Sequence, residues 1–292
     1  MEIGPVLALM ATVSLAISQV LIRRGVYHTE EAFTATVITV FVSTIPFLFI
    51  IPLTGDWNRL WSLSWQGFVL LGAAGIVHFV IGRYMIFDSI RLIGANKATP
   101  LGRTHALFAV LFGIILLHEP LTVPLIPGAL FIVGGATLVS FKREVGISNA
   151  QTRGILLGLG SGSCAGVSAM LIRLAMAEIG SPYAAAFISY VAASLIMAVL
   201  LCHRKLRVQL FQLTRSSLYI LVIAGIFSLA AYLLRYAALG YSPISVVQPL
   251  MATGVLFVFF LSFVLNRKID VFNWRVIAGI LFVVAGTFLL FL

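Results

Sequence analysis

The sequence has few charged residues and very few acidic ones. Only 10% of its 292 residues are charged, and 9 are Asp or Glu against 19 Lys or Arg. Because 61% of the residues are hydrophobic, the chain has too little polar surface for a soluble globular domain. No polar stretch is long enough for an extramembrane catalytic domain. The composition therefore indicates an all-α integral membrane protein.

Cysteine is also scarce, and the common motifs of catalytic sites are missing. Cys164 and Cys202 both fall in apolar segments and form no CxxC pair, so neither a disulfide framework nor a metal site is indicated. HExxH is absent, and Asp88 is the one aspartate expected inside the membrane. We predict no cofactor and no enzyme activity. The net charge of +10 lies mostly beside apolar segments, a pattern of membrane topology and not of nucleic-acid binding.

Apolar segments of about 20 residues, the length that crosses a bilayer, follow one another along the chain. The N-terminus is unlike a secretory signal, since Glu2 stands where basic residues are usual, so we expect the first segment to be retained. Ten transmembrane helices are predicted, over residues 5–22, 32–53, 67–90, 96–117, 122–141, 154–177, 183–202, 217–239, 245–265 and 272–292.

An internal repeat divides the chain into two halves. Residues 4–24 match residues 154–174 at an offset of 150, with Ser18 on Ser168. The segment GALFIVGGAT from Gly128 matches GILFVVAGTF from Gly279. We therefore predict two five-helix repeats, over residues 1–145 and 150–292. Because five is odd, the second repeat enters the membrane from the opposite side, and such inverted pairs commonly enclose a substrate site.

Two further patterns concern packing and orientation. Gly128 and Gly135 lie seven residues apart and form a smooth strip on which another helix can approach closely. Basic residues concentrate in the odd-numbered connections, which places these in the cytoplasm and both termini outside. The residues concerned are Arg23, Arg24, Arg91, Lys97, Lys142, Arg143, Arg153, Arg204, Lys205, Arg207, Arg215, Arg267, Lys268 and Arg275.

Two motifs of the first half give the chain a family resemblance. They are IGANKATPL from Ile93 and LHEPLTVPLIPGALFIVGGA from Leu117. With the repeated five-helix pattern, they resemble the EamA family of the drug/metabolite transporter superfamily. The resemblance implies a transporter of amino acids and other small metabolites, mostly exported, with cytoplasmic termini. One departure is that residues 266–268 replace the second Gly-Glu pair, so we expect no second acidic residue there.

Polar side chains inside the apolar segments are the predicted substrate-binding residues, because a charge in the bilayer is costly and usually functional. Arg103 follows Pro100 in an otherwise apolar segment and shares a face with Thr99. Arg83 faces the central cavity, or else reaches the interface or pairs with Asp88. The remaining members of the predicted set are Tyr84, His78, Gln19, Ser168, Tyr232, Arg235 and Gln248.

Several of these residues have a structural alternative. Gln19 and Ser168 can form hydrogen bonds between helices, and His78 can be a packing residue. Glu119 and Asp88 serve either coupling or structure, and for Glu119 the start of a helix favours a capping role.

We predict a secondary transporter in the plasma membrane that moves a small polar or amphiphilic metabolite outward by alternating access. The substrate is amino-acid-like or an organic anion, and the arginines favour a carboxylate or phosphate. Proton coupling, substrate exchange and facilitated diffusion stay open, as do a monomer and a homodimer. The alternatives are a carrier of a lipid-linked head group and a non-transport membrane subunit, which would have no central polar cavity.

Overall fold

The computed structural model describes residues 3–29, 32–108, 112, 125–140, 149–211, 213–241, 247, 250–270 and 272–290. Within these ranges the chain is helical and has no strand, as the composition predicts. Six helices are long and apolar enough to cross a membrane, and three apolar helices are shorter. Part of the predicted helix 96–117 lies outside the described residues, so the total of ten stays a prediction.

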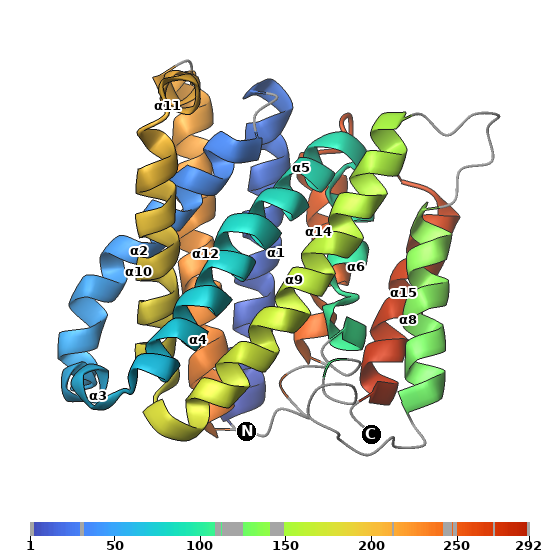
Figure 1. Cartoon of the computed structure of the whole chain (residues 1–292). Helices are drawn as coiled ribbons and strands as arrows, with labels where there is room; N and C mark the ends of the chain where they lie inside the picture. Colours follow the sequence, from blue (N-terminus) through green and yellow to red (C-terminus); the bar gives the residue numbers. More distant parts are fainter. Residues whose placement is uncertain are drawn as a thin grey trace.

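The helices of the first half follow the predicted segments closely. The third segment, predicted as one helix, is continuous but contains a π-helical turn, η1, between α4 and α5. The elements are α1 (Ile3–Thr29), α2 (Ala32–Thr54), α3 (Trp57–Ser62), α4 (Trp65–Gly75), η1 (Ile76–Gly82), α5 (Arg83–Ile93), α6 (Ala95–Gly102) and α8 (Leu125–Ser140) (Figure 1).

The second half has the same succession of long and short elements. Both chain termini lie at the lower end of the bundle in Figure 1. The elements are α9 (Asn149–Ile179), α10 (Pro182–Leu201), α11 (Arg204–Phe211), α12 (Arg215–Tyr241), α14 (Gly254–Leu265) and α15 (Trp274–Leu290).

Two short helices, α3 and α11, were not predicted. Each is partly apolar and packs on the bundle, since Leu60 is buried and Leu210 packs against the core around Phe47 and Tyr190. Their isolated apolar residues are too few to reveal a helix in the sequence. The two lie at opposite ends of the bundle, α3 at the lower end and α11 at the upper end (Figure 1).

Buried serines tie the long helices together in a repeated manner. Ser18 on α1 donates to the carbonyl oxygen of Ala224 on α12 at 2.8 Å. Ser168 on α9 donates to the carbonyl oxygen of Ala74 on α4 at 3.0 Å. The two serines are 150 residues apart in the sequence, and so are the two alanines that accept their hydrogen bonds. Packing of α1 on α12 therefore has the same chemistry as packing of α9 on α4.

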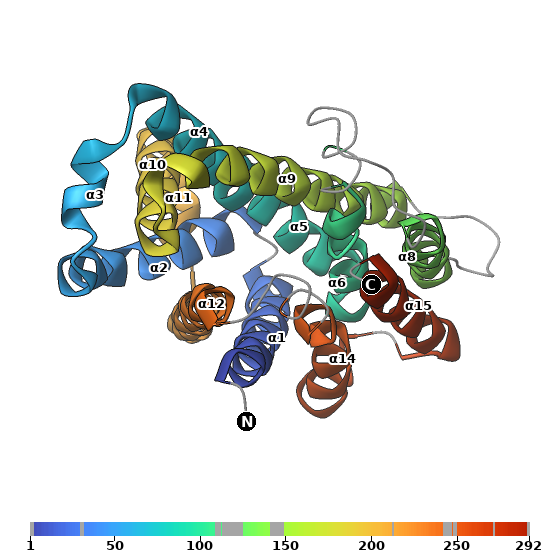
Figure 2. The same cartoon turned by 90° about the horizontal axis from the view of Figure 1, so that it is seen from below.

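Seen along the bundle, these two packed groups face each other. Figure 2 shows α9 with α4 and α5 on one side and α12 with α1 and α14 on the other. At one side of the bundle α2 packs on α10, and Thr44 and Ser194 join them through their hydroxyls at 2.8 Å. These two residues are again 150 positions apart. Side chains of both halves can meet in the interior between these two groups of helices.

The glycine strip of α8 packs on α15, as the spacing of Gly128 and Gly135 predicts. A Cβ on Gly135 would lie 2.6 Å from the carbonyl oxygen of Gly279, and one on Gly286 would lie 2.7 Å from that of Gly128. The later glycine of α8 meets the earlier glycine of α15, and the reverse holds for the other two, so the two helices run antiparallel. Only residues without a side chain permit this approach of two backbones.

This contact gives a matched pair of variants. Gly135→Ala is expected to destabilise the protein by about 1–3 kcal/mol, because the new methyl group meets backbone atoms that cannot move aside. Gly134→Ala is the control, since its Cβ would lie 3.6 Å from Phe282, an ordinary contact. Thermal unfolding in detergent measures both. Equal stability of the two variants would contradict the close packing of α8 on α15.

Candidate substrate site

The π-helical turn η1 determines which side chains of the third membrane segment face the interior. In an α-helix His78 and Arg83 would lie about 140° apart around the axis. Here the backbone N–H of Arg83 donates to the carbonyl oxygen of His78, five residues earlier. This wider turn brings the two side chains to the same side of the helix, near the middle of the apolar span Trp65–Ile93.

Arg83 lies in an aromatic surround at the centre of the protein. Arg83 is only 6% exposed, and its Nη2 donates a hydrogen bond to the hydroxyl of Tyr190 at 3.1 Å. Its guanidinium carbon lies 4.8 Å from the ring centre of Phe79, 5.6 Å from that of Tyr190 and 5.9 Å from that of Tyr232. The rings of Phe79 and Tyr190 stack at 3.9 Å. Cation–π attraction therefore holds this charge without a carboxylate.

Asp88 is not the partner of Arg83. Its carboxylate pairs with Arg91 at 2.6 Å and with Arg153 at 2.9 Å. The alternative of an Arg83–Asp88 ion pair is therefore wrong, because two arginines already occupy both oxygens of Asp88. Tyr84 is half-buried and packs against the apolar core that includes Ile90.

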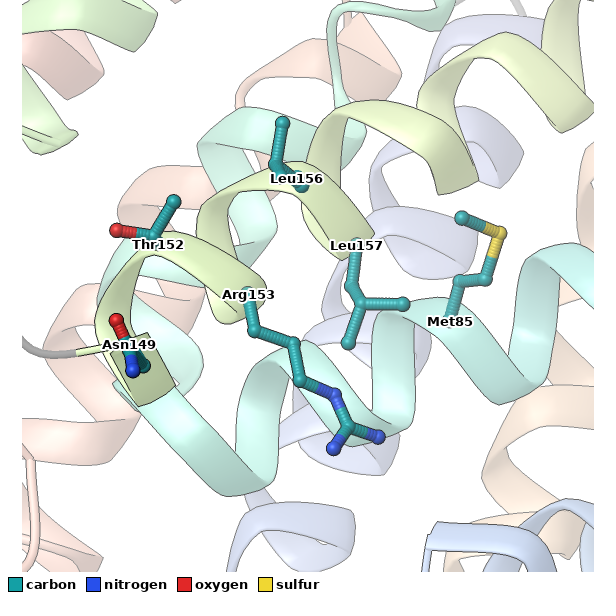
Figure 3. A pocket seen from close by; sticks show the side chains of 6 residues that line it. All are labelled: Met85, Asn149, Thr152, Arg153, Leu156 and Leu157. Atoms are coloured by element: carbon teal, nitrogen blue, oxygen red, sulfur yellow. The ribbon is translucent and has the colours of Figure 1, made fainter.

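A shallow pocket lies near this ion pair, between α5 and α9. Figure 3 shows its lining, to which Met85, Thr152 and Leu156 contribute together with Arg153. The lining is largely apolar, and the charge of Arg153 is bound to Asp88. The pocket therefore offers no free charged group to a ligand.

Further basic side chains lie near His78, which itself is close to Arg83. The Nε2 of His78 lies 3.1 Å from the hydroxyl of Tyr232 on α12. One turn further along α12, Arg235 is close enough to interact electrostatically with His78, Arg103 and His105. The structure thus brings together His78, Arg83, Arg103, Tyr232 and Arg235 from the predicted set, which we call the arginine cluster.

Arg103 reaches this cluster from the end of α6. A Cβ on Gly254 would lie 2.9 Å from Nη2 of Arg103 and 3.1 Å from Cγ2 of Thr12, so the missing side chain leaves room for the guanidinium. The side chain of Arg103 makes no hydrogen bond or ion pair with any described residue. Nearby, Thr99 donates to Oε1 of Gln19 at 3.0 Å, which joins α6 to α1.

The remaining predicted residues lie elsewhere. Ser168 is buried and bound to the carbonyl of Ala74, as its structural alternative expects. Gln248 and Glu119 lie outside the described residues. Phe79 and Tyr190, which complete the aromatic surround of Arg83, were not predicted. Phe79 is four residues before Arg83, and that spacing could have indicated it. Tyr190 is over a hundred residues away, and no motif marks an aromatic residue of an apolar helix as the partner of so distant an arginine.

A second polar centre, built on Arg23 and Asp270, joins α1 to the ends of three other helices, α5, α6 and α14. Arg23 was expected in a connection but lies within α1. It donates to the carbonyls of Ile90, Arg91 and Ile269 at 2.9, 2.7 and 2.6 Å. The first two are among the last carbonyls of α5, and that of Ile90 also accepts from the backbone N–H of Gly94. Arg23 Nε also lies 3.7 Å from Asp270.

Asp270 corrects the expectation that the second half lacks an acid at the Gly-Glu motif. The contact between α8 and α15 fixes an offset of 151, and at this offset Glu119 corresponds to Asp270. Its carboxylate lies over the first N–H groups of α6 and fills the space that a side chain at Gly94, with φ of +86°, would need. Ser262 donates to it at 2.8 Å.

Burial raises the pKa of the Asp270 carboxyl, and the charge of Arg23 offsets this only in part. The folded protein then binds the proton more tightly than the unfolded chain does. Stability is therefore expected to fall as the pH rises from the ordinary carboxyl pKa, about 3.9, through the raised value. Thermal unfolding at a series of pH values measures this slope. Asp270→Asn should flatten it, and an unchanged slope would contradict the assignment.

Comparisons with known proteins identify the family and the fold of this chain. The profile of the EamA-like transporter family matches residues 2–141 and again residues 152–292. A crystal structure described only as that of a protein aligns over 97% of this chain and 94% of its own, with a TM-score of 0.64 and 16% identity, which shows a shared fold. No curated protein matches the chain.

The helices and the repeated match define a multi-pass α-helical membrane protein of the drug/metabolite transporter superfamily. The chain belongs to the EamA-like transporter family, as its two motifs predict. Members of this family are membrane transporters, which act on small molecules within a lipid bilayer.

Proposed function

We propose that the protein is a secondary transporter that moves a small organic anion across the plasma membrane by alternating access. The observation that carries the proposal is the arginine cluster. Its members lie at the end of α6 and on η1 and α5 of the first half, and on α12 of the second. Buried guanidinium groups without counter-ions are costly in a membrane protein, and a bound anion compensates them. A purely structural subunit has no need of such a centre.

The arrangement of the halves supports alternating access. Residues 1–145 and 150–292 form two five-helix repeats of opposite orientation in this proposal. The equivalent bonds of Ser18 and Ser168 and the antiparallel contact of α8 with α15 support it. Inverted repeats of this kind rock about a fixed central site.

Flux into proteoliposomes tests the proposal. Vesicles loaded with an unlabelled organic anion should accumulate the same labelled anion by exchange, whereas vesicles without protein should not. Repeating the assay with an imposed proton gradient separates proton coupling from simple exchange. Failure of every anion tested to cross the membrane would reject transport of this class.

The orientation follows from the distribution of basic residues in the described part of the chain. Arg204 and Arg207 lie on α11 at the upper end of Figure 1, the end where α1 and α5 finish with Arg24 and Arg91. The positive-inside rule places this end in the cytoplasm. Export then runs from this end to the one that carries α3.

Native Cys202 reports on this orientation. It is exposed at the end of α10, next to α11, whereas Cys164 is half-buried. In intact cells a membrane-impermeant maleimide should leave Cys202 unlabelled and should modify it after permeabilisation. Cys202→Ser identifies any signal that comes from Cys164. Labelling of Cys202 in intact cells would reverse the proposed orientation.

A further inference from the structure

The arginine cluster contains three formal positive charges and no described acid. The four described acidic residues each have partners elsewhere. Asp88 and Asp270 pair with arginines at one end of the bundle. Asp56 pairs with Arg59, and Glu178 accepts from Ser64. No described carboxylate is therefore available at the cluster to receive an ammonium group.

The aromatic rings at the cluster do not provide an alternative cation site. Rings of this kind often bind a quaternary ammonium through their faces. Here Phe79, Tyr190 and Tyr232 surround the guanidinium of Arg83. A second cation would compete with this guanidinium and be repelled by it. The rings thus serve to hold a positive charge of the protein itself.

Two donors of the cluster are buried and have no hydrogen-bond partner among the described residues. They are Nη1 of Arg83 and Nε of Arg235. The residue Arg83 is only 6% exposed, and an anionic group bound beside it would satisfy this free nitrogen. Arg83 comes from the first half and Arg235 from the second. Arg103 supplies a third guanidinium, which is repelled by Arg235.

We propose that the transported substrate carries at least two negative charges and no ammonium group, as a dicarboxylate or a phosphate ester does. This rests on the proposed transport function and narrows it, because zwitterionic amino acids are excluded. One anionic group binds at Arg83, and a second lies between Arg103 and Arg235. A single negative charge leaves two guanidinium charges uncompensated, and an ammonium group adds to the positive charge.

Matched ligands test the charge requirement directly. Thermal unfolding of the purified full chain is measured with succinate, with succinamate, which has one charge fewer, and with aspartate, which adds an ammonium group. Glycerol phosphate and phosphoethanolamine form the corresponding phosphate pair. Ionic strength is kept equal with sodium chloride. We expect succinate or glycerol phosphate to bind at least about tenfold more tightly than its partners. Succinamate loses a charge-assisted contact, and the ammonium group of aspartate or phosphoethanolamine is repelled by the guanidinium groups.

Variants locate the binding. Arg103→Gln and Arg235→Gln should each reduce the preference for the dianion, whereas Arg24→Gln, at an exposed position of α1, should keep it. Equal or tighter binding of aspartate or phosphoethanolamine would overturn the charge requirement, as would a panel in which no anion stabilises the protein. A preference that Arg103→Gln and Arg235→Gln both leave unchanged would also overturn it.

Flux of the same compounds in proteoliposomes separates the two proposals. Binding of the dianion without flux contradicts transport and leaves the charge requirement standing. Flux of aspartate at the rate of succinate contradicts the charge requirement and leaves transport standing.

Discussion

Replacing Arg103 with alanine is expected to lower transport by about 10- to 100-fold, the loss that follows removal of one charge-assisted hydrogen bond to the substrate. The folded protein should persist, because the side chain of Arg103 has no hydrogen bond or ion pair with a described residue. Its charge is repelled by Arg235, so the ligand-free variant should unfold at a temperature no lower than that of the native protein. Initial flux rates and thermal unfolding measure the two effects.

The combination of results is what distinguishes a binding role from a structural one. A structural role for Arg103 predicts a lower unfolding temperature together with lower flux. A binding role predicts normal stability, lower flux and no stabilisation by an anion. Arg24→Ala is the matched control, since this arginine is exposed on α1. Unchanged flux in Arg103→Ala would remove this residue from the site.

Replacing Arg23 with alanine is expected to destabilise the protein by about 3–5 kcal/mol. The variant leaves the buried carboxylate of Asp270 without its counter-ion. It also removes the hydrogen bonds that Arg23 donates to the final carbonyls of α5, at Ile90 and Arg91. Unfolding in detergent, followed by heat or denaturant, measures the loss.

A milder change at the same centre is the control. Asp270→Asn keeps an oxygen over the start of α6 and leaves Arg23 bound to three carbonyls. It should therefore cost much less than Arg23→Ala. The double variant Arg23→Ala, Asp270→Asn should be more stable than Arg23→Ala alone, because no unpaired charge is then buried. Equal losses for Arg23→Ala and Asp270→Asn would contradict this account.

The fold was largely predictable because lipid imposes simple rules on the sequence. Segment length and hydrophobicity located the helices, and the glycine spacing identified the packing of α8. The end of α1 was placed too early, at residue 22, because an arginine usually marks the end of a membrane helix. Arg23 continues the helix because carbonyls of α5 and of the α14–α15 connection accept its hydrogen bonds.

The site was predictable only residue by residue. Arg83, Arg103 and Arg235 each stand out as charges in apolar segments, but their meeting depends on how distant helices pack. The π-helical turn that aligns His78 with Arg83 has no signature in hydrophobic periodicity. The role of Asp270 was hidden by an offset that changes from 150 to 151 along the chain. At an offset of 150 Glu119 aligns with Ile269, whereas at an offset of 151 it aligns with Asp270.

The seam between α8 and α15 has a consequence for motion. The contact of Gly128 with Gly286 becomes that of Gly279 with Gly135 when the two halves are exchanged. In the proposed alternating access, a contact that maps onto itself would keep the same shape whichever side of the bundle is open. We therefore expect this glycine seam to act as the fulcrum, while the helices that bear the arginines swing around it.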